Sequence, residues 1–167
     1  MRVASGVASL GALTYIAPVA APLYNRDILR LAAHIPNLGP IDSPHARVER
    51  RSAVCGSRVT VAVRLDEHGR VAALGQEVSA CALGQASAAL MGAHAMDRDG
   101  AELARARDEL AAFLRGERED AGDWPGIATL APARGFPARH RSILLPFEAI
   151  AEAVGQASAM RLAAAAE

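Results

Sequence analysis

The sequence predicts an α+β fold in which a small antiparallel sheet of three strands packs against helices on one face. Two observations predict it: apolar residues alternate with polar ones between positions 46 and 78, and helical spacing dominates everything after residue 81. The 167 residues allow one ordinary domain. With 51% hydrophobic and 22% charged residues the chain can build a packed core, which argues against wholesale disorder.

The three strands are expected to form a meander. The clearest strand covers residues 59–65, where valines at alternate positions predict one buried and one wet face. A turn at residues 66–69, which contains a glycine, leads to a returning strand over residues 71–78. Residues 46–54 are a weaker strand candidate, which would pair with the first across a turn at residues 55–57.

Helices are expected before and after these strands. The first begins near Leu23 and ends at the proline- and glycine-rich stretch 36–40. Asp99 stands three residues before Glu102, an arrangement typical of a capping box at a helix start. After the strands, apolar residues at helical spacing predict helices over residues 83–94, 99–114 and 137–154, with an irregular stretch at residues 116–135.

The first 22 residues need a separate interpretation. They resemble a short secretory signal with a small-residue end, but they carry a single positive charge and are interrupted by glycines and Pro18. The run is also too short and too weakly apolar for a membrane span. We therefore expect residues 1–22 to be a disordered or mis-started leader, residues 23–154 the folded domain, residues 155–167 an alanine-rich tail, and the protein to be cytoplasmic.

The charged residues and the cysteines exclude two classes of protein. Eighteen basic residues balance eighteen acidic ones, and this zero net charge argues against a dedicated nucleic-acid binder. Two cysteines allow one bridge at most, which rules out a disulfide-stapled miniprotein.

The two cysteines are the candidate functional residues. Cys55 falls in the turn between two strand candidates, and Cys81 falls where the last strand meets a helix, at the positive end of the helix dipole. Two loop thiols at one end of a sheet can ligate a soft metal or an iron–sulfur cluster, which bind thiolates. The sequence has no Cys-x-x-Cys pair, so two unrelated buried cysteines are the alternative.

Three stretches of the chain carry a resemblance to a known family. They read CGS at residues 55–57, SACALGQASAALM at residues 79–91 and FPARHRS at residues 136–142. Together they resemble the iron–sulfur cluster assembly scaffold family (NifU N-terminal type, IscU/SufU-like), most closely its SufU-like branch. The resemblance covers roughly residues 23–154 and implies a small antiparallel sheet backed by helices, which agrees with the pattern above.

This resemblance implies a scaffold or carrier and not an enzyme. Such scaffolds accept sulfur from a cysteine desulfurase as persulfide, gather iron, build a cluster on three cysteines and pass it to apo-proteins. By resemblance, Cys55 matches the first ligand and Cys81 the second. The implied cargo is a [2Fe–2S] cluster or zinc, and the implied partners are a cysteine desulfurase and apo-protein acceptors, with no nucleic acid and no membrane.

The chain departs from the family pattern at two positions. Ser57 stands where the family has an aspartate, and Ser142 stands where it has the third cysteine. A hydroxyl is a poor ligand for iron or zinc and cannot carry a persulfide. Ser57, Ser142 and His140 are therefore auxiliary ligand candidates, and Arg139 and Arg141 either stabilise thiolates or solvate the loop.

With two thiolates, a cluster would need further ligands from a partner, glutathione, a second subunit or His140. Two alternatives remain open beside the scaffold hypothesis. One is a degenerate member that acts as a non-ligating interaction partner of the sulfur-mobilisation machinery. The other is a metal-free sulfur relay, for instance through Cys81. Three other histidines are less suited to a site: His45, His68 and His94.

Overall fold

The computed structural model describes residues 22–166, so the expected leader lies outside the described part except for its last residue. Three strands form a meander in the order β1-β2-β3, and both strand pairs are antiparallel, which confirms the expected sheet. The elements, in chain order, are α1 (Arg26–Ala33), β1 (Ala46–Arg51), β2 (Arg58–Leu65), β3 (Val71–Ser79), α2 (Ala82–His94), α3 (Gly100–Arg115), the 3₁₀ helix η1 (Ile127–Gly135) and α4 (Pro137–Ala165).

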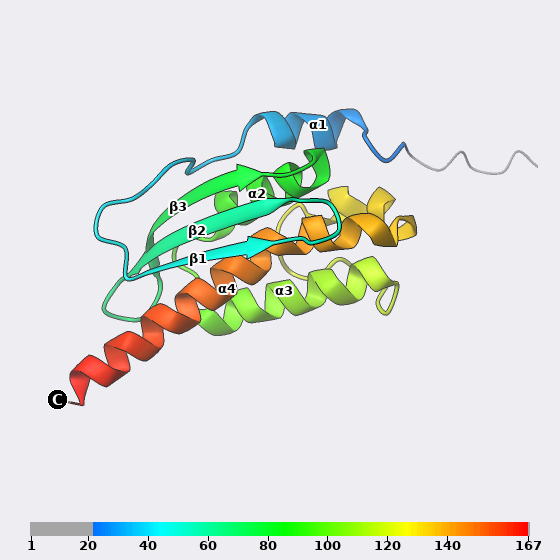
Figure 1. Cartoon of the computed structure of the whole chain (residues 1–167). Helices are drawn as coiled ribbons and strands as arrows, with labels where there is room; N and C mark the ends of the chain where they lie inside the picture. The colour runs from blue at the N-terminus through cyan, green and yellow to red at the C-terminus, as the bar shows by residue number, and fades with distance from the viewer. Residues whose placement is uncertain (1–21, 167) are drawn as a thin grey trace, which may run out of the picture.

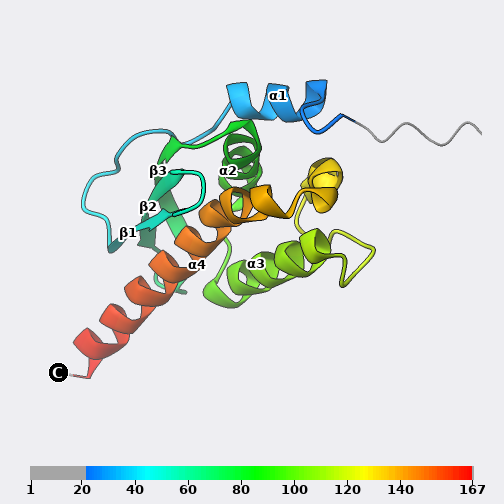
Figure 2. The same ribbon diagram turned by 45° about the vertical axis from the view of Figure 1, so that its right-hand side comes forward.

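The helices cover one face of the sheet, as expected for this α+β fold (Figures 1 and 2). α4 runs across β1 and β2, while α2 and α3 pack against α4, and α1 packs on α2. The core lies between α4 and the central strand, where Val59, Val61 and Val63 are fully buried in the same cluster as Phe147 and Ile150. Burial of each such side chain contributes about 1.5–3 kcal/mol of hydrophobic stabilisation.

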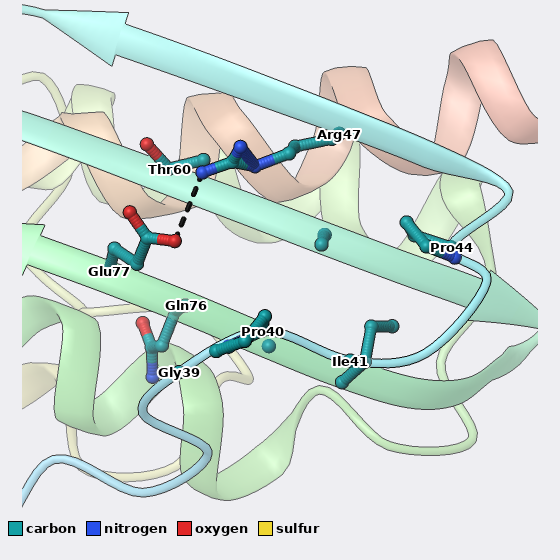
Figure 3. A pocket seen from close by; sticks show the side chains of 10 residues that line it. Gly39, Pro40, Ile41, Pro44, Arg47, Thr60, Gln76 and Glu77 are labelled. Atoms are coloured by element: carbon teal, nitrogen blue, oxygen red, sulfur yellow. Dashed lines mark hydrogen bonds and ion pairs between the residues drawn. The ribbon is translucent and has the colours of Figure 1, made fainter.

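The loop between α1 and β1 first pairs with the outer edge of β3, through a parallel bridge between Leu38 and Gln76, and then crosses the other face of the sheet (Figure 3). The Gly39 N–H donates to the Gln76 carbonyl at 2.9 Å, and the Gln76 N–H donates to the Asn37 carbonyl at 2.8 Å. This close approach requires glycine in β3, because a Cβ on Gly75 would lie 2.5 Å from the Gly39 carbonyl oxygen.

Asp99 and Glu102 form the expected capping box at the start of α3. The stretch at residues 116–135, expected to be irregular, contains the 3₁₀ helix η1. This segment is anchored ahead of η1 by Trp124, whose Nε1–H donates to the Leu90 carbonyl at 3.0 Å. η1 contains Pro132 and shows no regular apolar spacing, so the sequence pattern does not predict this helix.

α4 continues through residues 155–165, the segment that the composition sets apart as an alanine-rich tail. Alanine has the highest intrinsic helix propensity, and Arg161 ties this end of the helix to the β2–β3 turn by donating to the carbonyls of Asp66 and Glu67. None of the helices in the described part of the chain combines the length and the hydropathy that crossing a membrane needs.

Candidate thiol site

Both cysteines lie at the same end of the sheet. Cys55 is in the turn between β1 and β2, and Cys81 is the N-cap residue of α2, directly after β3. The register explains why they meet, because Arg58 at the start of β2 pairs with Ser79 at the end of β3. The antiparallel order therefore places two thiols from distant parts of the chain at one edge, and both residues are half-buried.

Two serine hydroxyls lie between the thiols. Ser57 Oγ is 3.1 Å from Cys55 Sγ and 3.1 Å from Ser142 Oγ. Ser142 Oγ is in turn 3.4 Å from Cys81 Sγ. Ser57 is 4% exposed and Ser142 is 0% exposed, so the hydroxyls form a buried floor beneath two thiols that reach solvent. We call Cys55, Ser57, Ser142 and Cys81 the hydroxyl-bridged thiol pair.

Close packing of α2 against α4 holds Ser142 in this place. A Cβ on Gly84 of α2 would lie 2.5 Å from Ser142 Oγ, so only glycine permits the approach. The Ser87 hydroxyl donates to the Ile143 carbonyl at 2.6 Å and joins the two helices. Pro146 has no N–H to donate to the Ser142 carbonyl, which interrupts the hydrogen-bond ladder of α4 at the site.

Hydrogen bonds in the turn change the acidity of Cys55. The side chain of Ser52, and after it that of Ser57, lowers the pKa of the Cys55 thiol from 9.0 to about 7, while burial acts in the opposite direction. A large share of Cys55 is therefore thiolate at neutral pH, the form that attacks electrophiles and binds soft metals. Ser52 was not among the residues predicted from sequence; its place three residues before Cys55 in a turn is the signal that could have found it.

The other candidate side chains form no hydrogen bond to either thiol within residues 22–166. His140 Nε2 lies 2.9 Å from the Ala133 carbonyl oxygen of η1, and no hydrogen bond joins it to a thiol within residues 22–166. Arg141 forms an ion pair with Glu148 at 2.6 Å. Arg139 is half-buried at the start of α4 and forms no ion pair with another described residue. The structure thus brings together the two cysteines and the two serines.

The site offers few side chains that can bind a metal ion. In the described range, no group of three His, Cys, Asp or Glu residues is arranged to hold a metal ion, and residues 1–21 contain none of these residue types. A structural zinc site needs four such ligands, and a two-iron cluster needs four thiolates. The protein atoms at the site are two thiols and two hydroxyls, so they do not complete either set.

The three histidines that the sequence makes less suited to a site, His45, His68 and His94, lie outside it. His45 Nδ1 accepts from the Leu65 N–H at 3.0 Å. His94 meets Trp124 edge-on, with ring centroids 6.5 Å apart. His68 lies in the β2–β3 turn, at the end of the sheet opposite the thiols.

A hollow on the other face of the sheet offers no comparable chemistry (Figure 3). It lies between the α1–β1 loop and the strands, with apolar walls from Pro40, Ile41 and Pro44. Its charged side chains, Arg47 and Glu77, form an ion pair at 3.0 Å and so compensate each other. The hydroxyl-bridged thiol pair is therefore the candidate functional site.

Comparison with known proteins finds similar sequences and similar solved structures, although no model of a known family matches the chain. The chain is 25% identical to the iron–sulfur cluster assembly scaffold protein IscU of Thermotoga maritima over 136 residues, which cover 81% of this chain and 95% of that protein. It is 34% identical to the solved structure of a nitrogen-fixing NifU-like protein (N-terminal) from Brucella abortus, with a TM-score of 0.77 and coverage of 81% of this chain and 94% of that one.

A third similarity concerns the fold alone. The structure of a candidate iron–sulfur cluster assembly scaffold protein for the SUF system, from thermophilic Fervidobacterium islandicum, superposes with a TM-score of 0.73 at 21% identity. The match covers 79% of this chain and 96% of that chain.

Proposed function

The chain belongs to the NifU-like family of iron–sulfur cluster assembly scaffold proteins, and on that premise we propose that it holds iron or a [2Fe–2S] cluster on the thiolates of Cys55 and Cys81 and passes it to apo-proteins. Scaffold proteins of this family are carriers and not catalysts, so we assign no catalytic residue. A cysteine desulfurase as sulfur source and apo-protein acceptors as clients complete the proposal, with the cytoplasm as its compartment.

One observation carries this proposal, namely the hydroxyl-bridged thiol pair. The two positions at which the chain departs from the family pattern, Ser57 and Ser142, lie 3.1 Å apart and directly between the two thiols. Soft thiolates are the ligands that iron–sulfur clusters prefer. The arrangement supports a scaffold site in which the third cysteine position and the aspartate position both carry neutral hydroxyls, which are placed to donate hydrogen bonds to bound sulfur.

The remaining ligands have to come from outside this set. His140 could serve only if its ring left the Ala133 carbonyl, 2.9 Å away. Arg139, which forms no ion pair with another described residue, is the better placed electrostatic support for an anionic cargo, since Arg141 is paired with Glu148. Cargo held by few protein ligands is released readily, which suits a carrier.

Anaerobic reconstitution tests the proposal. Wild-type protein would be treated with ferric iron and sulfide, desalted, and examined by visible absorption and iron analysis. We expect a sulfur-to-iron charge-transfer spectrum and bound iron in the wild type and in the control His68→Ala at the far end. We expect neither in Cys55→Ser/Cys81→Ser. Absence of chromophore and iron from the wild type would overturn the proposal.

The acidity of Cys55 favours a second candidate, a metal-free sulfur relay. A thiol with a pKa of about 7 is about half thiolate at neutral pH. This thiolate can attack the outer sulfur of a desulfurase persulfide, so that a new S–S bond forms on the scaffold while the S–S bond of the desulfurase breaks and its cysteine leaves as a thiolate. Incubation with a cysteine desulfurase and cysteine, followed by mass spectrometry, would reveal a persulfide on Cys55 or Cys81 without iron. Contact with the desulfurase that survives replacement of both cysteines by alanine would instead indicate a non-ligating interaction partner.

A further inference from the structure

The two outer edges of the sheet differ in what covers them. At the β3 edge the α1–β1 loop takes up the outward groups, because Gln76 exchanges backbone hydrogen bonds with Gly39 and Asn37 at 2.9 and 2.8 Å. β1 is the other outer strand (Figures 1 and 2), and within residues 22–166 no strand or loop pairs with its outer side. The described part of the chain therefore covers one edge of its sheet and leaves the other unpaired.

The register shows which groups β1 presents at this unpaired edge. The Ser52 N–H donates to the Ser57 carbonyl at 2.8 Å, and in an antiparallel pair every second residue bonds to the neighbouring strand. Counted back from Ser52, the N–H and C=O groups of Arg47, Glu49 and Arg51 point away from β2. These three residues are exposed, and their backbone groups form no hydrogen bond with another residue of the described range. An extended segment laid along β1 would find donors and acceptors at the spacing of a strand.

The same strand carries an excess of positive charge. Its sequence, ARVERR, contains three arginines and one glutamate. Glu49 lies 2.5 Å from Arg51 and 3.9 Å from Arg58, so two arginines share one counter-charge. Arg47 reaches across the face of the sheet to Glu77 at 3.0 Å, but both side chains are half-exposed, and ion pairs in water contribute little and exchange partners readily (Figure 3). Carboxylates on an incoming strand would therefore be attracted to this edge.

We propose that the outer edge of β1 binds an extended acidic segment of a partner protein, which joins the sheet as a fourth strand. Main-chain hydrogen bonds to Arg47, Glu49 and Arg51 would hold the segment, and the arginines would select carboxylate side chains. A second copy of the chain suits this edge less well, since it would bring the same excess of arginine. The inference goes beyond the proposed carrier function and uses neither cysteine.

Amide hydrogen exchange of the wild-type chain, followed residue by residue by NMR, tests the proposal. The probe is a capped peptide of alternating glutamate and valine (EVEVEV), and the control peptide has lysine in place of glutamate. We expect saturating EVEVEV to slow exchange at Arg47, Glu49 and Arg51 at least fivefold, and the lysine peptide to have no effect. No slowing at these amides, or equal slowing by both peptides, would overturn the proposal. So would a peptide-free dimer in which the same amides are already protected.

Two substitutions of one residue separate strand addition from simple charge attraction. Glu49→Pro and Glu49→Gln both remove the negative charge, but only proline removes the outward N–H, and an edge strand tolerates proline at such a position. We expect Glu49→Gln to bind EVEVEV at least as tightly as wild type, and Glu49→Pro to bind it at least tenfold more weakly. Equal affinity of the two variants, with both folded by circular dichroism, would overturn strand addition.

A charge reversal keeps the test decisive should Glu49→Pro fail to fold. Arg47→Glu/Arg51→Glu should lose binding of EVEVEV and gain binding of the lysine peptide, and unchanged preference for EVEVEV would overturn the proposal. Cys55→Ser/Cys81→Ser should bind EVEVEV with wild-type affinity, so failure of peptide binding and failure of iron binding are distinguishable. Loss of peptide binding in this cysteine variant would place the contact at the thiols and contradict the assignment to β1.

Discussion

The two turns that flank β2 use polar groups in opposite ways. In the β2–β3 turn, Asp66 accepts from the N–H groups of His68 and Arg70 at 2.9 and 2.8 Å, and Arg161 of α4 donates to the turn carbonyls. In the β1–β2 turn, hydroxyls surround a half-buried thiol and no charged group closes the site. At the β2–β3 end of the sheet, the polar groups of the turn are hydrogen-bonded within the chain. At the β1–β2 end, two thiols stay available to a ligand.

The same contrast appears in how the two ends titrate. The Arg70 N–H lowers the pKa of Asp66 below its usual range, so this carboxylate is ionised throughout the physiological range. Hydrogen bonds from Ser52 and Ser57 bring the pKa of Cys55 to about 7, so its charge changes near neutral pH. Similar local hydrogen bonding thus produces a fixed structural charge at one end and a reactive group at the other.

The largest expected effect is a loss of bound iron when the thiol end of the sheet is changed, but not when the opposite end is changed. Cys81→Ser should reduce iron bound after reconstitution at least tenfold, because a single remaining thiolate cannot hold the cargo against competing thiols. Its thermal midpoint should change by little, since Cys81 is half-buried and a serine fits the helix N-cap. Asp66→Asn at the far end should retain iron at the wild-type level. Loss of iron in both variants would show that the effect is one of folding.

A glycine pair tests how tightly the thiol end is packed. Gly84→Ala should destabilise the protein by about 1–3 kcal/mol, because its Cβ would lie 2.5 Å from Ser142 Oγ and 2.8 Å from Ala80 Cβ. Gly155→Ala, in an open stretch of α4 with nothing within 4 Å, should instead stabilise it by about 0.5–1 kcal/mol. Urea unfolding followed by the fluorescence of Trp124, the single tryptophan, measures both. Equal effects would contradict the close approach of α2 and α4.

Removal of a hydroxyl should change thiol reactivity more than stability. Ser52→Ala and Ser57→Ala each remove a hydrogen bond that favours the thiolate, so the pKa of Cys55 should rise, with the larger rise for Ser52→Ala. A higher pKa means less thiolate at pH 7 and therefore slower alkylation there. The rate of iodoacetamide labelling of Cys55 between pH 5 and 10, followed by mass spectrometry in a Cys81→Ser background, gives the pKa. An unchanged profile would show that the serines do not tune this thiol.

The smallest effect is expected at the β2–β3 turn. Because the folded-state pKa of Asp66 is lowered, its contribution to stability is present above the unfolded pKa and is lost as pH falls through the folded value. Asp66→Asn should therefore unfold at a slightly lower temperature than wild type at pH 7, and the difference should become smaller in acid. Calorimetry at pH 7 and at pH 3 measures this, and a difference that grows in acid would contradict it.

Much of the fold could be predicted from local patterns. The alternation in β2, the capping box at Asp99 and the turn after Leu65 are encoded by neighbouring residues, and the structure has all three. The 3₁₀ helix η1 could not be predicted, because tertiary contacts around Trp124 and not periodicity hold the chain there.

The candidate site was predictable only in part. The meander topology already implies that Cys55 and Cys81 meet at one end of the sheet. The bridge between Ser57 and Ser142 depends on how α4 docks against α2, which no local pattern specifies. For the same reason the direction of the His140 ring, toward η1, could not be predicted from sequence.

X-ray absorption at the iron edge of the loaded wild-type protein tests the central claim most directly. If Cys55 and Cys81 are the protein ligands and Ser57 and Ser142 only donate hydrogen bonds, each iron should be surrounded by sulfur alone. An oxygen or nitrogen neighbour on the iron, from a serine hydroxyl or from His140, would contradict the account.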